Sequence, residues 1–94
     1  MKTINSFADY ISDEERVSRQ ELEIVRFEKE LILKMVEIRE ADSMTQRELA
    51  RISGVKQPAI ARLENRKSTP QIDTLLKLLV PLGYTLDIVP LRRA

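Results

Sequence analysis

Amide and basic side chains gather between Ser43 and Lys67. This stretch holds six Lys or Arg against two Asp or Glu, a net charge of +4, together with Gln46, Gln57 and Asn65. A glutamine amide donates and accepts at once, so it can pair with N6 and N7 of adenine, whereas Lys and Arg can donate to guanine O6 and N7 or to phosphate. The chemistry that these residue types favour is recognition of nucleic acid.

The composition argues against catalysis. The 94 residues include neither His nor Cys, which excludes disulfides, thiolate nucleophiles, imidazole bases and ordinary zinc sites. No glycine-rich phosphate loop is present, and the acidic clusters at 13–15, 28–30 and 37–40 fall on expected solvent faces of helices. We therefore expect no enzymatic activity, no metal, no cofactor and no small-molecule substrate.

The charge is divided unevenly along the chain. Residues 1–42 carry seven Lys or Arg and eleven Asp or Glu, a net of −4, whereas residues 43–94 carry nine and four, a net of +5. This asymmetry predicts two partners, phosphate for the basic half and a basic protein for the acidic half. No apolar run approaches the roughly 20 residues of a membrane span, and the N-terminus lacks the apolar core of a secretory signal. We expect one cytoplasmic domain that makes no membrane contact.

The basic stretch predicts two short helices joined by a tight turn. Thr45 and Glu48 have the spacing of a capping box at the start of the first helix, and Gly54 can adopt the left-handed conformation that ends it. Ile60 and Leu63 form the apolar stripe of the second helix. This combination is the helix-turn-helix unit, whose second helix enters the DNA major groove.

From about Leu31 to Leu86 the chain resembles the Xre/Cro-type helix-turn-helix domains, which share the lambda-repressor-like fold. The resemblance is carried in one register by Gln46, Leu49, Ala50, Gly54, Val55, Gln57, Ile60, Leu63, Glu64 and Asn65. It implies that the first residues of the reading helix face base edges, namely Lys56, Gln57, Pro58, Ala59 and Arg62. The phosphate contacts that it implies are Gln46, Arg47, Asn65, Arg66 and Lys67.

The resemblance also implies a structural ion pair between Arg39 and Glu64, partly buried and fixing the angle between helices. Two positions depart from the family pattern. Lys56 stands where the family often has a Ser or Thr helix cap, and lysine caps poorly. Arg66 stands where a glycine often follows the asparagine, which leaves the geometry of that turn open.

The flanking segments are predicted to be mainly helical. Residues 2–12 fit a short amphipathic helix or an extended arm, and residues 13–41 fit one long helix or two broken ones. Apolar residues recur near the helical period at Ile24, Phe27, Leu31, Met35 and Ile38. A last helix is expected over residues 71–80, with an apolar face formed by Ile72, Leu75, Leu76, Leu79 and Val80. We expect an N-terminal helical extension over residues 1–26 and an Xre-type domain over residues 27–94.

Residues 84–90 alternate between apolar and polar side chains, which predicts a β-strand. No second strand is evident in the sequence, so a simple solution is pairing with the same strand of a second copy across a two-fold axis. The dimer contacts would then be Tyr84, Leu86, Ile88 and Pro90. The alternative is an extended tail that lies on the core of its own chain.

The layout of the whole chain resembles HigA-type antitoxins, in which a helical extension precedes an Xre-type domain. This resemblance implies a homodimer that binds a palindromic operator and neutralises a small basic RNase toxin of the RelE/HigB type. The acidic N-terminal half would complement such a toxin, and the expected contacts are Phe7, Tyr10, Ile11, Val17, Leu22, Ile24 and Val25. Two alternatives remain: packing of Phe7, Tyr10 and Ile11 on the chain's own long helix, and a stand-alone repressor without a toxin.

Overall fold

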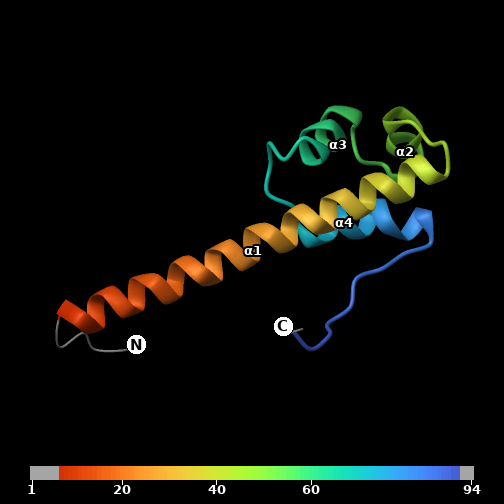
Figure 1. The fold of residues 1–94 in the computed structure, drawn as a ribbon. Helices are drawn as coiled ribbons and strands as arrows, with labels where there is room; N and C mark the ends of the chain where they lie inside the picture. Colours follow the sequence, from red (N-terminus) through yellow and green to blue (C-terminus); the bar gives the residue numbers. More distant parts are fainter. Residues whose placement is uncertain (1–6, 92–94) are drawn as a thin grey trace. The chain divides into compact units, whose positions relative to one another are not determined.

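The computed structural model describes the backbone of residues 7–91 and the side chains of residues 18–91. Over this range the chain is helical without strands, as the sequence predicts for a mostly α bundle (Figure 1). The elements are α1 (Phe7–Ala41), α2 (Gln46–Ser53), α3 (Gln57–Glu64), α4 (Ile72–Leu79) and the 3-10 helix η1 (Val80–Leu82). The chain divides into two compact units, one ending at Leu31 and one beginning at Ile32, and α1 contributes to both.

Helix α1 is continuous over 35 residues. The segment has no glycine or proline, the two residues that most strongly interrupt a helix. Of the two alternatives for residues 13–41, one long helix is therefore correct and two broken helices are not. The helix begins at Phe7, so residues 7–12 form helix and not an extended arm. In the first unit, the side chains of Leu22, Ile24, Val25 and Phe27 are all more than half exposed.

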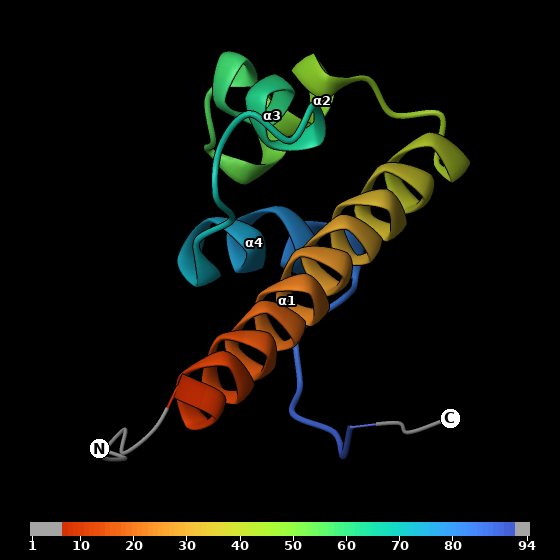
Figure 2. The same ribbon diagram turned by 60° about the vertical axis from the view of Figure 1, so that its left-hand side comes forward.

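The core of the second unit is formed by side chains from α1, α2, α3 and α4. Figures 1 and 2 show α2 and α3 side by side, with α4 near the C-terminal part of α1. The contribution of α1 to this core confirms that its C-terminal part is the first helix of the bundle. The buried apolar side chains are Ile32, Met35, Leu49, Ile60, Leu63, Leu75, Leu78 and Leu79.

The apolar face expected for α4 is wrong at its two ends. Ile72 and Val80 are 70% and 61% exposed, whereas Leu78, which the expected face omits, is fully buried. Leu75, Leu78 and Leu79 have the i, i+3, i+4 spacing of one helical face. Val80 follows Leu75 by five residues, about 140° further round the helix, so it points away from that face.

The local signals for α2 act as predicted. The Thr45 hydroxyl accepts from the Glu48 backbone N–H at 3.1 Å, and the Glu48 carboxylate accepts from the Thr45 backbone N–H at 3.2 Å. Gly54 ends the helix with φ 78°. A Cβ added at Gly54 would have open space around it, so the requirement for glycine there comes from backbone conformation alone.

Three helical segments end in the same left-handed motif. Ser43, Arg66 and Gly83 have φ values of 54°, 61° and 89°. After each of them, the next backbone N–H donates to a carbonyl five residues back, at 2.8 to 3.1 Å, which is the Schellman arrangement. The turn after α3 therefore forms with Arg66 in the position that glycine prefers, at a conformational cost of about 1 kcal/mol.

The β-strand expected over residues 84–90 is absent from the single chain. Residues 84–91 adopt neither helix nor strand, and the part of the chain that the structure describes contains no strand with which they could pair. A strand is stabilised by hydrogen bonds to a neighbour, so alternation alone could not produce one here. The same described range holds no helix both long and apolar enough to cross a membrane.

Candidate nucleic-acid interface

The turn between α2 and α3 sets the position of the reading helix. Gly54 donates its backbone N–H to the Ala50 carbonyl at 3.0 Å, and the Val55 N–H donates to the Ser53 hydroxyl at 3.1 Å. Helix α3 then begins without a side-chain cap at Lys56, as expected for lysine, and Pro58 occupies its first turn. Proline is tolerated there because its missing N–H would have no intrahelical partner.

Helix α3 presents opposite faces to the core and to solvent. Ile60 and Leu63 are 1% and 3% exposed, and they anchor the helix on the bundle. The residues that the sequence assigns to base contact run from Lys56, just before α3, to Arg62 in its last turn. All are exposed except Gln57, which is half-buried: Lys56, Gln57, Pro58, Ala59 and Arg62. All five positions are therefore at least partly accessible to a ligand.

Arg39 and Glu64 form a bidentate ion pair between α1 and α3. Arg39 Nε donates to Glu64 Oε2 and Arg39 Nη2 donates to Glu64 Oε1, both at 2.8 Å. The two side chains are 11% and 9% exposed. Arg39 Nη1 also donates to the Met44 carbonyl at 2.7 Å. The hydrogen bond to Glu64 is the main cause that raises the pKa of Arg39 above its ordinary value.

Two glutamines continue this polar network toward the exposed surface. Gln46 Nε2 donates to Glu64 Oε1 at 2.8 Å, and Gln57 Nε2 donates to Gln46 Oε1 at 2.9 Å. Gln46 and Gln57 are the first residues of α2 and α3, so the motif places the two helix N-termini within side-chain reach of each other. We call the set Arg39, Glu64, Gln46 and Gln57 the polar relay.

The sequence assigned roles to all four relay residues but did not predict that the two glutamines are joined. The available signal was positional. Each glutamine lies beside a helix-start signal: Gln46 follows the cap at Thr45, and Gln57 precedes Pro58, which favours the first turn of a helix. Two amides at the starts of adjacent short helices are candidates for a direct hydrogen bond.

The residues assigned to phosphate contact occupy two places. Gln46 and Arg47 open α2, where backbone N–H groups favour an anion. Asn65, Arg66 and Lys67 follow α3, where all three side chains are exposed. The first place is joined to the start of α3 by the Gln46–Gln57 hydrogen bond, and the second directly follows the end of α3.

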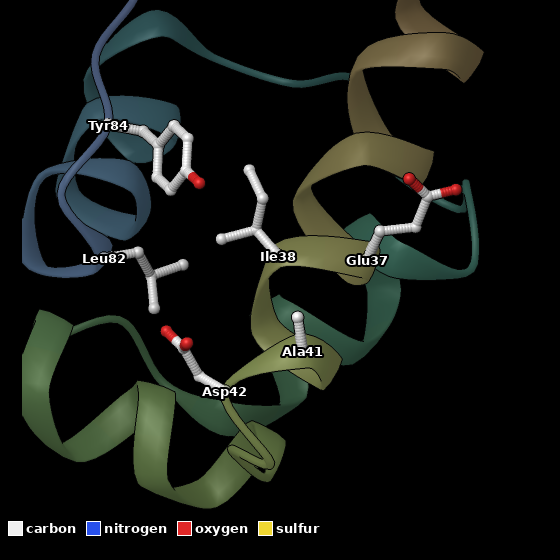
Figure 3. Close-up of a pocket in the computed structure, with 6 residues that line it drawn as sticks. All are labelled: Glu37, Ile38, Ala41, Asp42, Leu82 and Tyr84. Atoms are coloured by element: carbon white, nitrogen blue, oxygen red, sulfur yellow. The ribbon is translucent and has the colours of Figure 1, made fainter.

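A surface pocket of about 270 Å³ lies elsewhere in the second unit. In Figure 3, Tyr84 and Leu82 point toward Ile38 of α1. The lining residues are Glu37, Ile38, Ala41, Asp42, Leu82 and Tyr84. None of them belongs to the polar relay or to the positions assigned to DNA contact, so the pocket is separate from the candidate interface.

The remaining assigned residues are described only in part. Of those assigned to a toxin, Leu22, Ile24 and Val25 are 63%, 59% and 51% exposed. The side chains of the other four, Phe7, Tyr10, Ile11 and Val17, lie outside the described residues. Of those assigned to a dimer, Tyr84, Ile88 and Pro90 are exposed and Leu86 is half-buried.

The fold and the exposed polar face of α3 define a helix-turn-helix domain, a class of domain that binds DNA. The family model described as helix-turn-helix matches residues 35–89, more than half of the chain. The chain belongs to this helix-turn-helix family.

Two relatives extend the comparison. An uncharacterized HTH-type transcriptional regulator from Haemophilus influenzae is 44% identical over 88 residues, which cover 94% of this chain and 85% of the relative. A solved structure described as a toxin–antitoxin module from Streptococcus pneumoniae is 33% identical with a TM-score of 0.57, covering 95% of this chain and 97% of that chain. The chain is thus related to a transcriptional regulator and similar in structure to a component of a toxin–antitoxin module.

Proposed function

We propose that this protein is a HigA-type antitoxin. In this proposal it acts in the cytoplasm as a dimer, represses its own operon by binding a palindromic operator, and neutralises a RelE/HigB-type RNase toxin by direct contact. The observation that carries the proposal is the likeness to the toxin–antitoxin module chain, which extends over nearly the full length of both chains. A likeness confined to the helix-turn-helix region would support a DNA-binding role alone.

Operator recognition is assigned to the exposed face of α3. Two copies related by a two-fold axis would place two such helices in successive major grooves, about one helical turn apart. Gln57 would read adenine, and Lys56 or Arg62 would read guanine. Pro58 and Ala59 would contact a thymine methyl group, and the residues that open α2 and follow α3 would hold phosphate.

Toxin binding is assigned to the extension over residues 1–26, ahead of the Xre-type domain over residues 27–94. Within it, Leu22 and Val25 lie on one face of α1 and Ile24 on the opposite face, and all three side chains are more than half exposed. The net charge of −4 over residues 1–42 complements a basic partner. The exposed pair Leu22 and Val25, with complementary charge around it, is a suitable contact for a small basic toxin.

Co-purification tests the toxin assignment. The chain is expressed with the protein from the adjacent reading frame, which alone carries a tag, and we expect the two to elute together and the growth arrest to be relieved. Leu22→Asp should weaken the complex at least tenfold, because it places a charge in the apolar contact. Gln20→Asp, which adds the same charge at an exposed polar position of the same helix, should not. Absence of any complex would reject the antitoxin function, and equal behaviour of the two variants would reject the contact surface.

Dimerisation is assigned to the C-terminal segment, through pairing of residues 84–90 with the same residues of a second copy. Ile88 is 96% exposed, and a second copy would cover it and supply the missing strand partner. We expect Ile88→Asp to convert the dimer to a monomer in sedimentation equilibrium. Thr85→Asp adds the same charge on the opposite face of an extended segment, because residues 85 and 88 are an odd number of positions apart. This variant should leave the dimer intact. A dimer that survives Ile88→Asp would contradict this interface.

A stand-alone repressor without a toxin partner is the second candidate. It is favoured by the relative from Haemophilus influenzae, which is described as a transcriptional regulator. The DNA-binding assignments are the same under both functions, and the co-purification experiment separates them.

A further inference from the structure

The polar relay has a direction that is set by the residue at its centre. Glu64 accepts from Arg39 through both oxygens and from Gln46 through Oε1. An ionised carboxylate has no proton to donate. The amide of Gln46 must therefore turn Nε2 toward Glu64. Its Oε1 then faces Gln57.

The same logic fixes the amide of Gln57. Gln46 presents an oxygen to it, so Gln57 must turn Nε2 toward Gln46, as the 2.9 Å hydrogen bond shows. One N–H of Gln57 Nε2 and the whole of Oε1 remain available. These are one donor and one acceptor side by side, the pattern that complements N7 and N6 of adenine in the major groove.

We propose that Glu64 is a positioning residue for base specificity, since the direction of the relay determines which edge Gln57 presents to DNA. The proposal rests on the proposed DNA-reading function of α3. It assigns to Glu64 a role beyond joining α1 to α3. Gln57 reads adenine because a carboxylate two hydrogen bonds away holds its amide in one of two otherwise equivalent orientations.

The substitution Glu64→Gln should remove this constraint. Arg39 donates at both oxygen positions of Glu64 and has only donors, so either orientation of the new amide sets its nitrogen against one Arg39 N–H. Neither orientation is then favoured, so residue 64 no longer requires an N–H from Gln46, and the amides of Gln46 and Gln57 populate both directions of the relay. In the second direction Gln57 turns its oxygen inward and both N–H groups outward, and two donors complement the N7 and O6 acceptors of guanine. The preference for adenine over guanine opposite Gln57 should therefore fall.

Selection from a randomised DNA duplex library tests this. The full-length protein, Glu64→Gln and Gln57→Ala are used at one salt concentration, and the position that loses its preference in Gln57→Ala marks the base opposite Gln57. We expect Glu64→Gln to lower the adenine-to-guanine ratio there by roughly tenfold or more, with the other positions unchanged. The matched control is Glu48→Gln, the same substitution in α2 at a residue whose hydrogen bonds go to Thr45.

The outcomes are separable. An unchanged adenine-to-guanine ratio at that position with uniformly weaker binding would show that Glu64 is only structural and would overturn the inference. Absence of any sequence preference in the unsubstituted protein would instead reject the proposed DNA-reading function.

Amide hydrogen exchange of the free protein gives a second measurement that needs neither DNA nor a folded variant. One of the two Gln57 Nε2 protons should be protected in the unsubstituted protein. Equal, fast exchange of both would overturn the inference.

Discussion

Replacing Arg39 with methionine is expected to lower the free energy of unfolding by about 3 kcal/mol. The substitution leaves the Glu64 carboxylate, 9% exposed, without the two 2.8 Å hydrogen bonds from the guanidinium. It also removes the donor to the Met44 carbonyl. Loss of one member of a buried pair costs about 3–5 kcal/mol, and the lower value applies here because both side chains retain some exposure.

Urea denaturation of the full chain measures this effect. The protein concentration is kept fixed, because the proposed dimerisation would make stability depend on concentration. Arg47→Met is the matched control, since Arg47 is exposed on α2 and its replacement should change stability by no more than about 0.5 kcal/mol. Adding Glu64→Met to Arg39→Met removes the stranded charge and should recover part of the loss. A loss for Arg39→Met no larger than for Arg47→Met would mean that the ion pair contributes nothing to stability.

The features that the sequence predicted correctly depend on residues close together in the chain. The capping box links Thr45 to Glu48, and the left-handed cap at Gly54 closes on Ala50. Each involves residues no more than four apart, so residue type and spacing are sufficient. The closeness of Arg39 and Glu64, which are 25 residues apart, could not follow from spacing and was expected only from the family resemblance.

The features that were wrong or missed depend on tertiary or intermolecular packing. Exposure of Val80 and burial of Leu78 follow from how α4 sits on the bundle. Periodicity cannot resolve this, because apolar residues surround most of the helix, namely Leu75, Leu76, Leu78, Leu79 and Val80. The strand expected over residues 84–90 requires a partner that the single chain does not supply. The Gln46–Gln57 hydrogen bond forms because the turn brings the starts of α2 and α3 together. The sequence of either helix by itself does not predict this closeness.

Gln57→Ala is expected to weaken binding to the cognate operator by roughly ten- to a hundredfold per half-site, while binding to random duplex DNA hardly changes. Random DNA is held mainly through phosphate, and the amide of Gln57 is assigned to a base edge. Gln57 is half-buried and lies outside the apolar core, so its truncation should cost the fold no more than about 1 kcal/mol. A large loss of affinity would therefore report recognition rather than unfolding.

Fluorescence anisotropy with both duplexes at one salt concentration measures the difference. Lys67→Ala is the contrasting variant, because Lys67 is an exposed cation after α3 that is assigned to phosphate. Its loss should weaken binding to both duplexes about equally. It should also reduce the slope of log affinity against log salt concentration by about one. If Gln57→Ala instead behaves like Lys67→Ala, Gln57 contacts the backbone. The polar relay would then orient the amide of Gln57 for a phosphate contact. The sequence preference would have to come from Lys56 or Arg62.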